Sequence, residues 1–167
     1  MPMTVRVMGM SEEESAAWLG LAQLIQVLPA ALDSQLQRDS GLTHFEFTVL
    51  TVLAFAPERT LRMSVLAQAT AATLPRLSHV CTRLARRGLV ERTSCPDDGR
   101  ATNITLSSQG KRTVARATPG HRDLVRRLVI EALSPEQLSD LTAITTVIAA
   151  RLGDTAECQH AGTAEEG

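Results

Sequence analysis

The feature that most constrains the fold of this chain lies between residues 73 and 106, where a basic amphipathic helix, a glycine and a hairpin are predicted in succession. Residues that recur every three or four positions share one face of a helix, and here that face is apolar: Leu74, Leu77, Val80, Cys81 and Leu84. The opposite face carries Arg76, His79, Arg83 and Arg86. A helix that is anchored on one side and cationic on the other suits insertion into a groove lined with phosphates.

Two short runs of strand-forming residues, 89–94 and 101–106, follow the helix and predict a hairpin. Asp98 and Gly99 form a turn dipeptide between them, because glycine adopts a positive φ without steric cost. The turn places Arg100 at or beside the tip of the hairpin, and an arginine on a thin projecting loop can enter the minor groove of DNA. Together the helix and the hairpin predict a winged helix-turn-helix.

The residues before the basic helix complete this motif. Residues 60–62 are predicted as a short strand that pairs with the hairpin, and Ser64 as the cap of a brief helix over residues 65–70. Thr73 is the predicted N-cap of the basic helix, and Gly88 supplies the left-handed residue that ends it.

At these residues the sequence resembles the multiple-antibiotic-resistance regulator (MarR) family of bacterial transcription factors. The resemblance rests on an R-L-x-x-x-G-L-V helix end at residues 83–90, a D-x-R hairpin tip at 98–100 and an L-[ST]-x-x-G helix entry at 106–110. The helical pattern extends it from about residue 11 to residue 152. The resemblance implies a mainly α fold with a small antiparallel β wing, in which N- and C-terminal helices form a dimer around winged helix-turn-helix domains.

The distribution of charge agrees with a basic, DNA-facing middle, although the net charge of the whole chain is only −1. Residues 59–127 carry 14 basic and 4 acidic side chains, whereas the rest of the chain carries 3 basic and 14 acidic ones. This split predicts a basic lobe joined to an acidic one. An ordinary solvated helix face is the alternative interpretation, but it does not explain why four cations lie opposite the apolar stripe of the one helix that precedes a hairpin.

Before this middle region, the pattern predicts two helices. The first begins at a capping box over residues 11–14 and ends at Gly41, with a kink expected at Pro29 because proline lacks an N–H donor. A second capping box, over residues 43–46, opens the next helix.

After the hairpin, Ser107 is the predicted cap of a long basic helix, and Pro119–Gly120 should bend or break it. Ser134 caps a last apolar helix that has proline at its first position. The predicted organisation is a flexible arm (1–10), an N-terminal dimerisation helix (11–38), a winged helix-turn-helix DNA-binding domain (39–106), C-terminal dimerisation helices (107–152) and a disordered tail (153–167).

The two outer apolar helices predict a homodimer, because a small winged-helix core cannot cover so much apolar surface. Burial within a single chain is the alternative, and the resemblance implies the dimer. Two recognition helices would then lie roughly 34–36 Å apart and read a palindromic site in double-stranded DNA. The predicted interface residues are Trp18, Leu21, Leu128, Leu138, Leu141, Ile144 and Ile148.

Matching the family's helix onto this one places Pro75, Arg76, Ser78 and His79 in the part that enters the major groove. Arg76 is the candidate for a bidentate contact to guanine, which discriminates between bases by about 1–3 kcal/mol. His79 stands where the family often has arginine, and this departure leaves the cognate sequence open.

The remaining DNA-binding assignments concern affinity and the wing. Arg83, Arg86 and Arg87 are expected to hold phosphates, which gives affinity without sequence information. Arg100 is assigned to the minor groove, and Asp98 either orients a wing arginine or serves only the turn. Ser64 and Thr73 complete the predicted DNA-binding set.

The resemblance also implies that a small, often aromatic or phenolic, ligand binds between the dimer helices and the DNA-binding lobe. Trp18, His44, Phe47 and His121 lie near where that cleft should be, and core packing or surface exposure is the alternative for each. Such a ligand would shift the population of the DNA-competent spacing. The predicted protein is a ligand-modulated transcriptional regulator, with repression as the expected mode and activation as the alternative.

Two other regulatory classes stay open: a constitutive or architectural DNA binder without effector, and a cysteine redox sensor. Some relatives sense oxidants through a cysteine on the first helix, but Cys81, Cys95 and Cys158 lie elsewhere. Cys81 fits a small core residue, whereas Cys95, beside the wing, is the candidate for oxidation.

Other functions find no support in the sequence. The histidines are scattered, the cysteines lack metal-ligand spacing, and we expect neither a metal nor another cofactor. No nucleophile–base pair, paired carboxylates or phosphate-binding loop has a readable spacing, so no enzymatic activity is expected. The chain shows no signal peptide and no apolar run long enough to cross a bilayer, which predicts a cytoplasmic protein with reduced thiols and no membrane partner.

Overall fold

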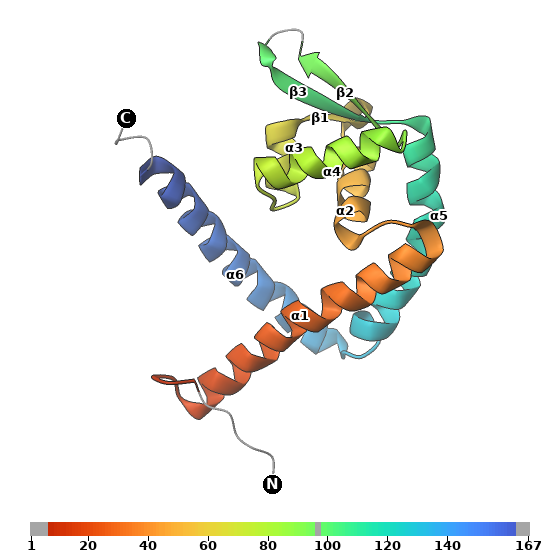
Figure 1. Cartoon of the computed structure of the whole chain (residues 1–167). Coiled ribbons are helices and arrows are strands. Elements are labelled where there is room, and N and C mark those ends of the chain that lie inside the picture. The colour runs from red at the N-terminus through yellow and green to blue at the C-terminus, as the bar shows by residue number, and fades with distance from the viewer. Residues whose placement is uncertain (1–6, 96–97, 163–167) are drawn as a thin grey trace. The chain divides into compact units, whose positions relative to one another are not determined.

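The structure is a computed structural model that describes residues 7–95 and 98–162, with side chains described for residues 7–94 and 101–153. The chain divides into two compact units, one extending to Leu124 and the other beginning at Val125, and each is described by itself. The first unit contains a winged helix-turn-helix preceded by a long helix (Figure 1).

The helix-turn-helix and its wing follow one another as the sequence predicts. The elements are α2 (His44–Phe55), β1 (Thr60–Arg62), α3 (Met63–Ala69), α4 (Leu74–Arg86), β2 (Val90–Cys95) and β3 (Asp98–Leu106). The sheet has the strand order β1-β3-β2 and is antiparallel throughout, with Leu61 opposite Ile104. The predicted pairing of residues 60–62 with the hairpin is confirmed.

A single hydrophobic core lies beneath the wing and connects α2, α3 and α4 with the sheet. These short elements are held together mainly by burial of apolar area, which contributes roughly 25 cal/mol of free energy per Å². The fully buried side chains include Leu50, Leu53, Leu66, Leu77, Leu84 and Ile104.

The ends of α3 and α4 depart in detail from the prediction. The N-cap of α3 is Arg62, so Ser64 lies inside the helix and the predicted Ser64 cap is wrong, because β1 runs directly into the helix. Thr73 is the N-cap of α4, but its side chain accepts no cap hydrogen bond. Pro75 stands in the first turn and has no N–H to donate to it. Gly88 follows α4 with φ 69°, as predicted.

The helix α1 (Glu12–Ser40) begins and ends as the sequence predicts. Ser11 and Glu14 form a capping box, and Gly41 ends the helix with φ 64°. The helix continues through Pro29, and the kink expected there stays a prediction. By length and composition alone α1 is long and apolar enough to cross a membrane, so the expectation that no run has this property is wrong. Serine, glycine and glutamine interrupt its apolar residues, so the apolar run is not obvious in the sequence.

The helix α5 (Ser108–Val125) continues through Pro119 and Gly120, so of the bend or break expected there the break does not occur and the bend stays a prediction. Close packing explains both of its glycines. A side-chain carbon at Gly110 would collide with the Leu89 carbonyl oxygen, and one at Gly120 would lie 3.1 Å from both Asp39 Oδ2 and Gln35 Nε2. Irregular geometry comes later, in the π-helix η2 (Arg126–Ile130).

The second unit consists chiefly of η2 and α6 (Pro135–Gly162). Ser134 and Gln137 form the predicted cap, with Gln137 N donating to Ser134 Oγ over 3.3 Å. The helix extends to Gly162, beyond the end predicted at Leu152, so residues 153–162 are helical where the sequence analysis expects disorder. Alanine, glutamate and glutamine in this segment have good helix propensity. Residues 1–6 of the predicted arm and 163–167 of the predicted tail lie outside the described residues.

Candidate nucleic-acid interface

The basic face of α4 lies on the surface of the first unit because the opposite face is anchored in the core. Leu77, Cys81 and Leu84 are fully buried, and Val80 is nearly so. Arg76, His79, Arg83 and Arg86 are exposed. The predicted amphipathic helix is therefore confirmed, and its cationic residues share one solvent-facing side.

Near its N-terminus, α4 is in contact with an aromatic ring of α2. The guanidinium carbon of Arg76 lies over the Phe45 ring, 4.2 Å from the ring centroid. Phe45 is half-buried and packs against the hydrophobic core. Within the described part of the chain, Arg76 makes no hydrogen bond or ion pair, so its N–H donors stay available.

At its other end, α4 is joined to α2 by ion pairs. Glu46, whose side chain is 3% exposed, accepts a hydrogen bond from Arg83 Nε over 2.8 Å and pairs with Arg87 Nη1 at 3.5 Å. Its Oε2 also accepts from the backbone N–H of Thr43 over 2.9 Å, and Thr43 Oγ1 accepts from the N–H of Glu46 over 3.0 Å. The predicted capping box thus also holds the last turn of α4, a role the sequence analysis missed.

The wing contributes a further arginine that the sequence analysis missed. Arg92 on β2 is exposed, and its Nη1 donates to Thr82 Oγ1 of α4 over 2.6 Å. Asp98 and Arg100 lie on β3 close to the turn, beside a register shift at Ser94–Cys95. The side chains of Asp98 and Arg100 are outside the described residues, so their predicted roles stay predictions.

The other predicted DNA-binding residues belong to α3 and α4. Thr73 and Pro75 are exposed at the start of α4, Ser78 is half-buried, and Ser64 is exposed in α3.

Three of the four predicted ligand-binding residues come together on the other side of α2. The His121 ring of α5 lies 5.6 Å from the His44 ring and 4.7 Å from the Phe47 ring, centroid to centroid. Its Nδ1 is buried and has no hydrogen-bond partner among the described residues. Burial, together with the neighbouring His44, lowers the pKa of His121. Trp18 is 48% exposed on α1 and takes part in no ring contact in the described part of the chain.

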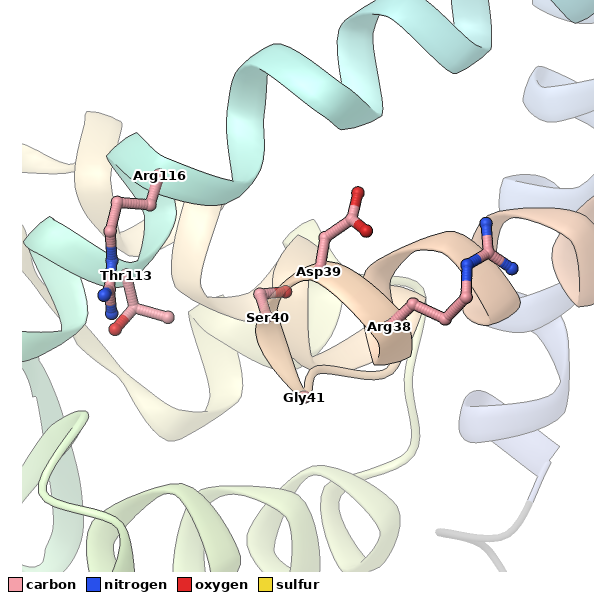
Figure 2. A pocket seen from close by; sticks show the side chains of 6 residues that line it. All are labelled: Arg38, Asp39, Ser40, Gly41, Thr113 and Arg116. Carbon is pink, nitrogen blue, oxygen red and sulfur yellow. The ribbon is translucent and has the colours of Figure 1, made fainter.

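A separate polar pocket of about 330 Å³ lies where the end of α1 meets α5. It was not predicted. Figure 2 shows Arg38 to Gly41 on one side and Thr113 and Arg116 on the other. The side chains of Arg38 and Arg116 point in different directions, so the two guanidinium groups do not converge on a common ligand position (Figure 2).

The predicted interface residues are all exposed or half-buried. Trp18, Leu128, Leu141, Ile144 and Ile148 have exposed fractions between 38% and 56%, and Leu21 and Leu138 are half-buried. These apolar side chains belong to α1, η2 and α6, and their place in a dimer interface stays a prediction.

The cysteine described in full does not resemble a reactive thiol. Cys81 is completely buried, and burial raises the pKa of its thiol to about 11, although the Arg92 guanidinium acts in the opposite direction. Since the thiolate is the reactive form, this favours the predicted packing role over oxidation. The side chains of Cys95 and Cys158 are outside the described residues. In the described part of the chain no three His, Cys, Asp or Glu side chains are placed to hold a metal ion.

Comparison with known proteins agrees with a winged-helix regulator. The model of the MarR family matches residues 40–101. Sco3205, a MarR family transcriptional regulator from Streptomyces coelicolor solved in complex with DNA, is 38% identical, with coverage of 84% of this chain and 88% of that one and a TM-score of 0.82. AbsC, another MarR family regulator from that organism, is 32% identical over 89% of this chain and 99% of its own, with a TM-score of 0.83.

A more distant match shows the fold alone. The regulator BldR from Sulfolobus solfataricus is 19% identical over 83% of this chain and 96% of its own, with a TM-score of 0.71. No protein with a curated description matches the chain significantly. From the two close relatives and the family model, the chain belongs to the MarR family of transcriptional regulators.

Proposed function

We propose that this protein is a homodimeric repressor that binds a specific palindromic DNA site through α4 and the β2–β3 wing, and that a small ligand modulates it. The observation that carries the proposal is the exposed cationic face of α4, which is held rigidly because the opposite face is buried. Sco3205, with the same fold and 38% identity, was solved in complex with DNA, which supports DNA as the partner.

In this proposal α4 enters the major groove with its N-terminal half. Arg76 contacts a guanine and His79 a neighbouring base edge, while Arg86 binds a phosphate. Arg83 and Arg87 are 44% and 36% exposed, so donors not used by Glu46 can also reach phosphates. Arg100 enters the minor groove from the wing.

The exposed apolar residues of α1 and α6 form the proposed dimer interface. A two-fold dimer turns two copies of α4 toward half-sites about one helical turn apart, which corresponds to a palindromic operator. Binding should therefore require a duplex that contains two half-sites.

The cluster of His44, Phe47 and His121 is the proposed ligand site, because two imidazole rings and a phenyl ring supply surfaces for an aromatic ligand. The unpaired Nδ1 of His121 offers one buried polar group to a phenolic hydroxyl. A ligand there would change the affinity for DNA, because it would bind one of two states of the dimer more tightly than the other.

The experiment is selection of bound fragments from genomic DNA by the full chain, followed by titration of the enriched duplex and of a random duplex of equal length. We expect an enriched inverted repeat that binds at least a hundred-fold more tightly than the random duplex, with steep salt dependence. Equal affinity for both duplexes would contradict sequence-specific regulation and favour an architectural DNA binder. A duplex with one half-site is the control, and we expect the chain to lose binding to it.

A further inference from the structure

Neither the fold nor the charge of α4 explains why the Arg76 guanidinium lies over the Phe45 ring. Phe45 belongs to the first turn of α2, and the chain contains only 3 phenylalanines, 1 tryptophan and no tyrosine. Its ring packs against the core and at the same time lies under the guanidinium of Arg76, 4.2 Å from centroid to Cζ. Because the ring is held by the core, the position it gives to Arg76 is fixed relative to α4.

An aromatic partner differs chemically from an anionic one. An aromatic ring attracts a guanidinium through its quadrupole and accepts no conventional hydrogen bond, so all five N–H donors remain free. A carboxylate partner uses those donors, as Glu46 does with Arg83 and Arg87. A bidentate contact to guanine O6 and N7 needs two donors of one guanidinium at the same time. Phe45 therefore supports Arg76 without occupying the groups that read a base.

We infer that Phe45 is a positioning residue for base reading: its ring holds the Arg76 side chain on the surface of α4 in readiness for the major groove. The inference rests on the proposed DNA-binding function. Arginine loses much rotamer freedom when it binds, and a side chain that is already oriented loses less. Cation–π contacts at exposed sites change an equilibrium constant by about two- to five-fold, which sets the size of the effect.

The experiment compares three single variants and one double variant of the full chain on the selected operator and on a random duplex. Phe45→Leu keeps an apolar side chain but removes the ring, and should weaken operator binding about two- to five-fold while leaving the random duplex within error. Phe45→Tyr keeps the ring and should bind the operator as the natural chain does. Phe55→Leu is the matched control, because Phe55 lies at the other end of α2 and is 88% exposed, whereas the ring beneath Arg76 is that of Phe45.

The double variant separates positioning from general support of the fold. If Phe45 acts through Arg76, adding Phe45→Leu to Arg76→Ala should cause no further loss of operator binding. A further loss equal to that of the single variant would overturn the inference, as would equal weakening on both duplexes. Tighter operator binding by Phe45→Leu would also overturn it, since the ring would then withhold Arg76 from DNA.

These outcomes differ from failure of the proposed function itself. If the natural chain shows no preference for any duplex, both the function and the positioning role fall. If the natural chain discriminates and the double variant shows additive losses, only the positioning role falls.

Discussion

The two ends of α4 hold their arginines in different ways. At the C-terminal end, Arg83 and Arg87 pair with a carboxylate that is 3% exposed, and at the N-terminal end Arg76 lies over an aromatic ring. The first arrangement uses hydrogen-bond donors to join α4 to α2, whereas the second leaves the donors free. The comparison separates two arginines that join α4 to α2 from one whose hydrogen-bond donors stay free in the described part of the chain, although all lie on the same face.

The largest expected effect tests the anchor. Glu46→Ala should lower the free energy of unfolding by about 2–4 kcal/mol, because two arginines lose their buried partner and α2 loses its capping box. The measurement is urea unfolding at one fixed protein concentration. Glu14→Ala is the matched control: it removes the equivalent capping-box glutamate of α1, which is exposed, and should cost about 0.5–1 kcal/mol. Equal losses in the two variants would show that the ion pairs contribute nothing.

The next effect tests the presented arginine. Arg76→Ala should reduce the difference in binding free energy between the operator and the random duplex by about 1–3 kcal/mol, because a base contact is lost. The substitution breaks no ion pair in the described part of the chain. Its unfolding free energy should change little. Titration of both duplexes by fluorescence anisotropy measures the ratio. If the variant instead lost stability and kept its preference for the operator, Arg76 would belong with the arginines that anchor α4 to α2.

A smaller effect concerns Arg86, which is exposed on α4 and makes no ion pair with a described residue. Arg86→Gln should weaken both duplexes alike and reduce the slope of log affinity against log salt by about 0.9, the value for one phosphate contact. Arg122→Gln, which removes an exposed arginine of α5 that pairs with Asp123, is the control and should leave the slope unchanged. An unchanged slope in Arg86→Gln would remove Arg86 from the interface.

The smallest expected effect is on the pH dependence of the free energy of unfolding, and it concerns His121, which packs on the side of α2 away from these arginines. The pKa of His121 is lowered by burial and by His44, so the unfolded chain takes up a proton at a higher pH than the folded chain does. The free energy of unfolding should therefore fall as the pH drops through the ordinary histidine pKa of about 6.5. His121→Phe should show a shallower fall between pH 8 and pH 5.5 than the natural chain. Parallel curves for the two proteins would contradict the assignment.

Sequence periodicity predicts most of the helices and strands of this protein, because each depends on local patterns. Two capping boxes, the glycines that end α1 and α4, and the pairing of β1 with β3 follow from residue types and spacing. The wrong details come from competition between local signals. Ser64 resembles a cap, but the preceding strand runs into the helix at Arg62. Pro119 resembles a break, but α5 continues through it.

The division of labour among the arginines was beyond prediction, because it depends on contacts between residues far apart in the chain. Arg83 and Glu46 are 37 positions apart, and nothing in either segment signals the pair. On a helical wheel Arg76 and Arg83 look equivalent. The wing roles of Asp98 and Arg100, drawn from turn chemistry and resemblance, stay predictions.

The first turn of α2 has a consequence for how a signal could spread. Its consecutive residues His44, Phe45, Glu46 and Phe47 contact His121 of α5, Arg76 at the start of α4, Arg83 near its end, and His121 again. Under the proposed function, a ligand that displaces this turn would act on both ends of α4 at once, because Phe45 contacts Arg76 and Glu46 contacts Arg83.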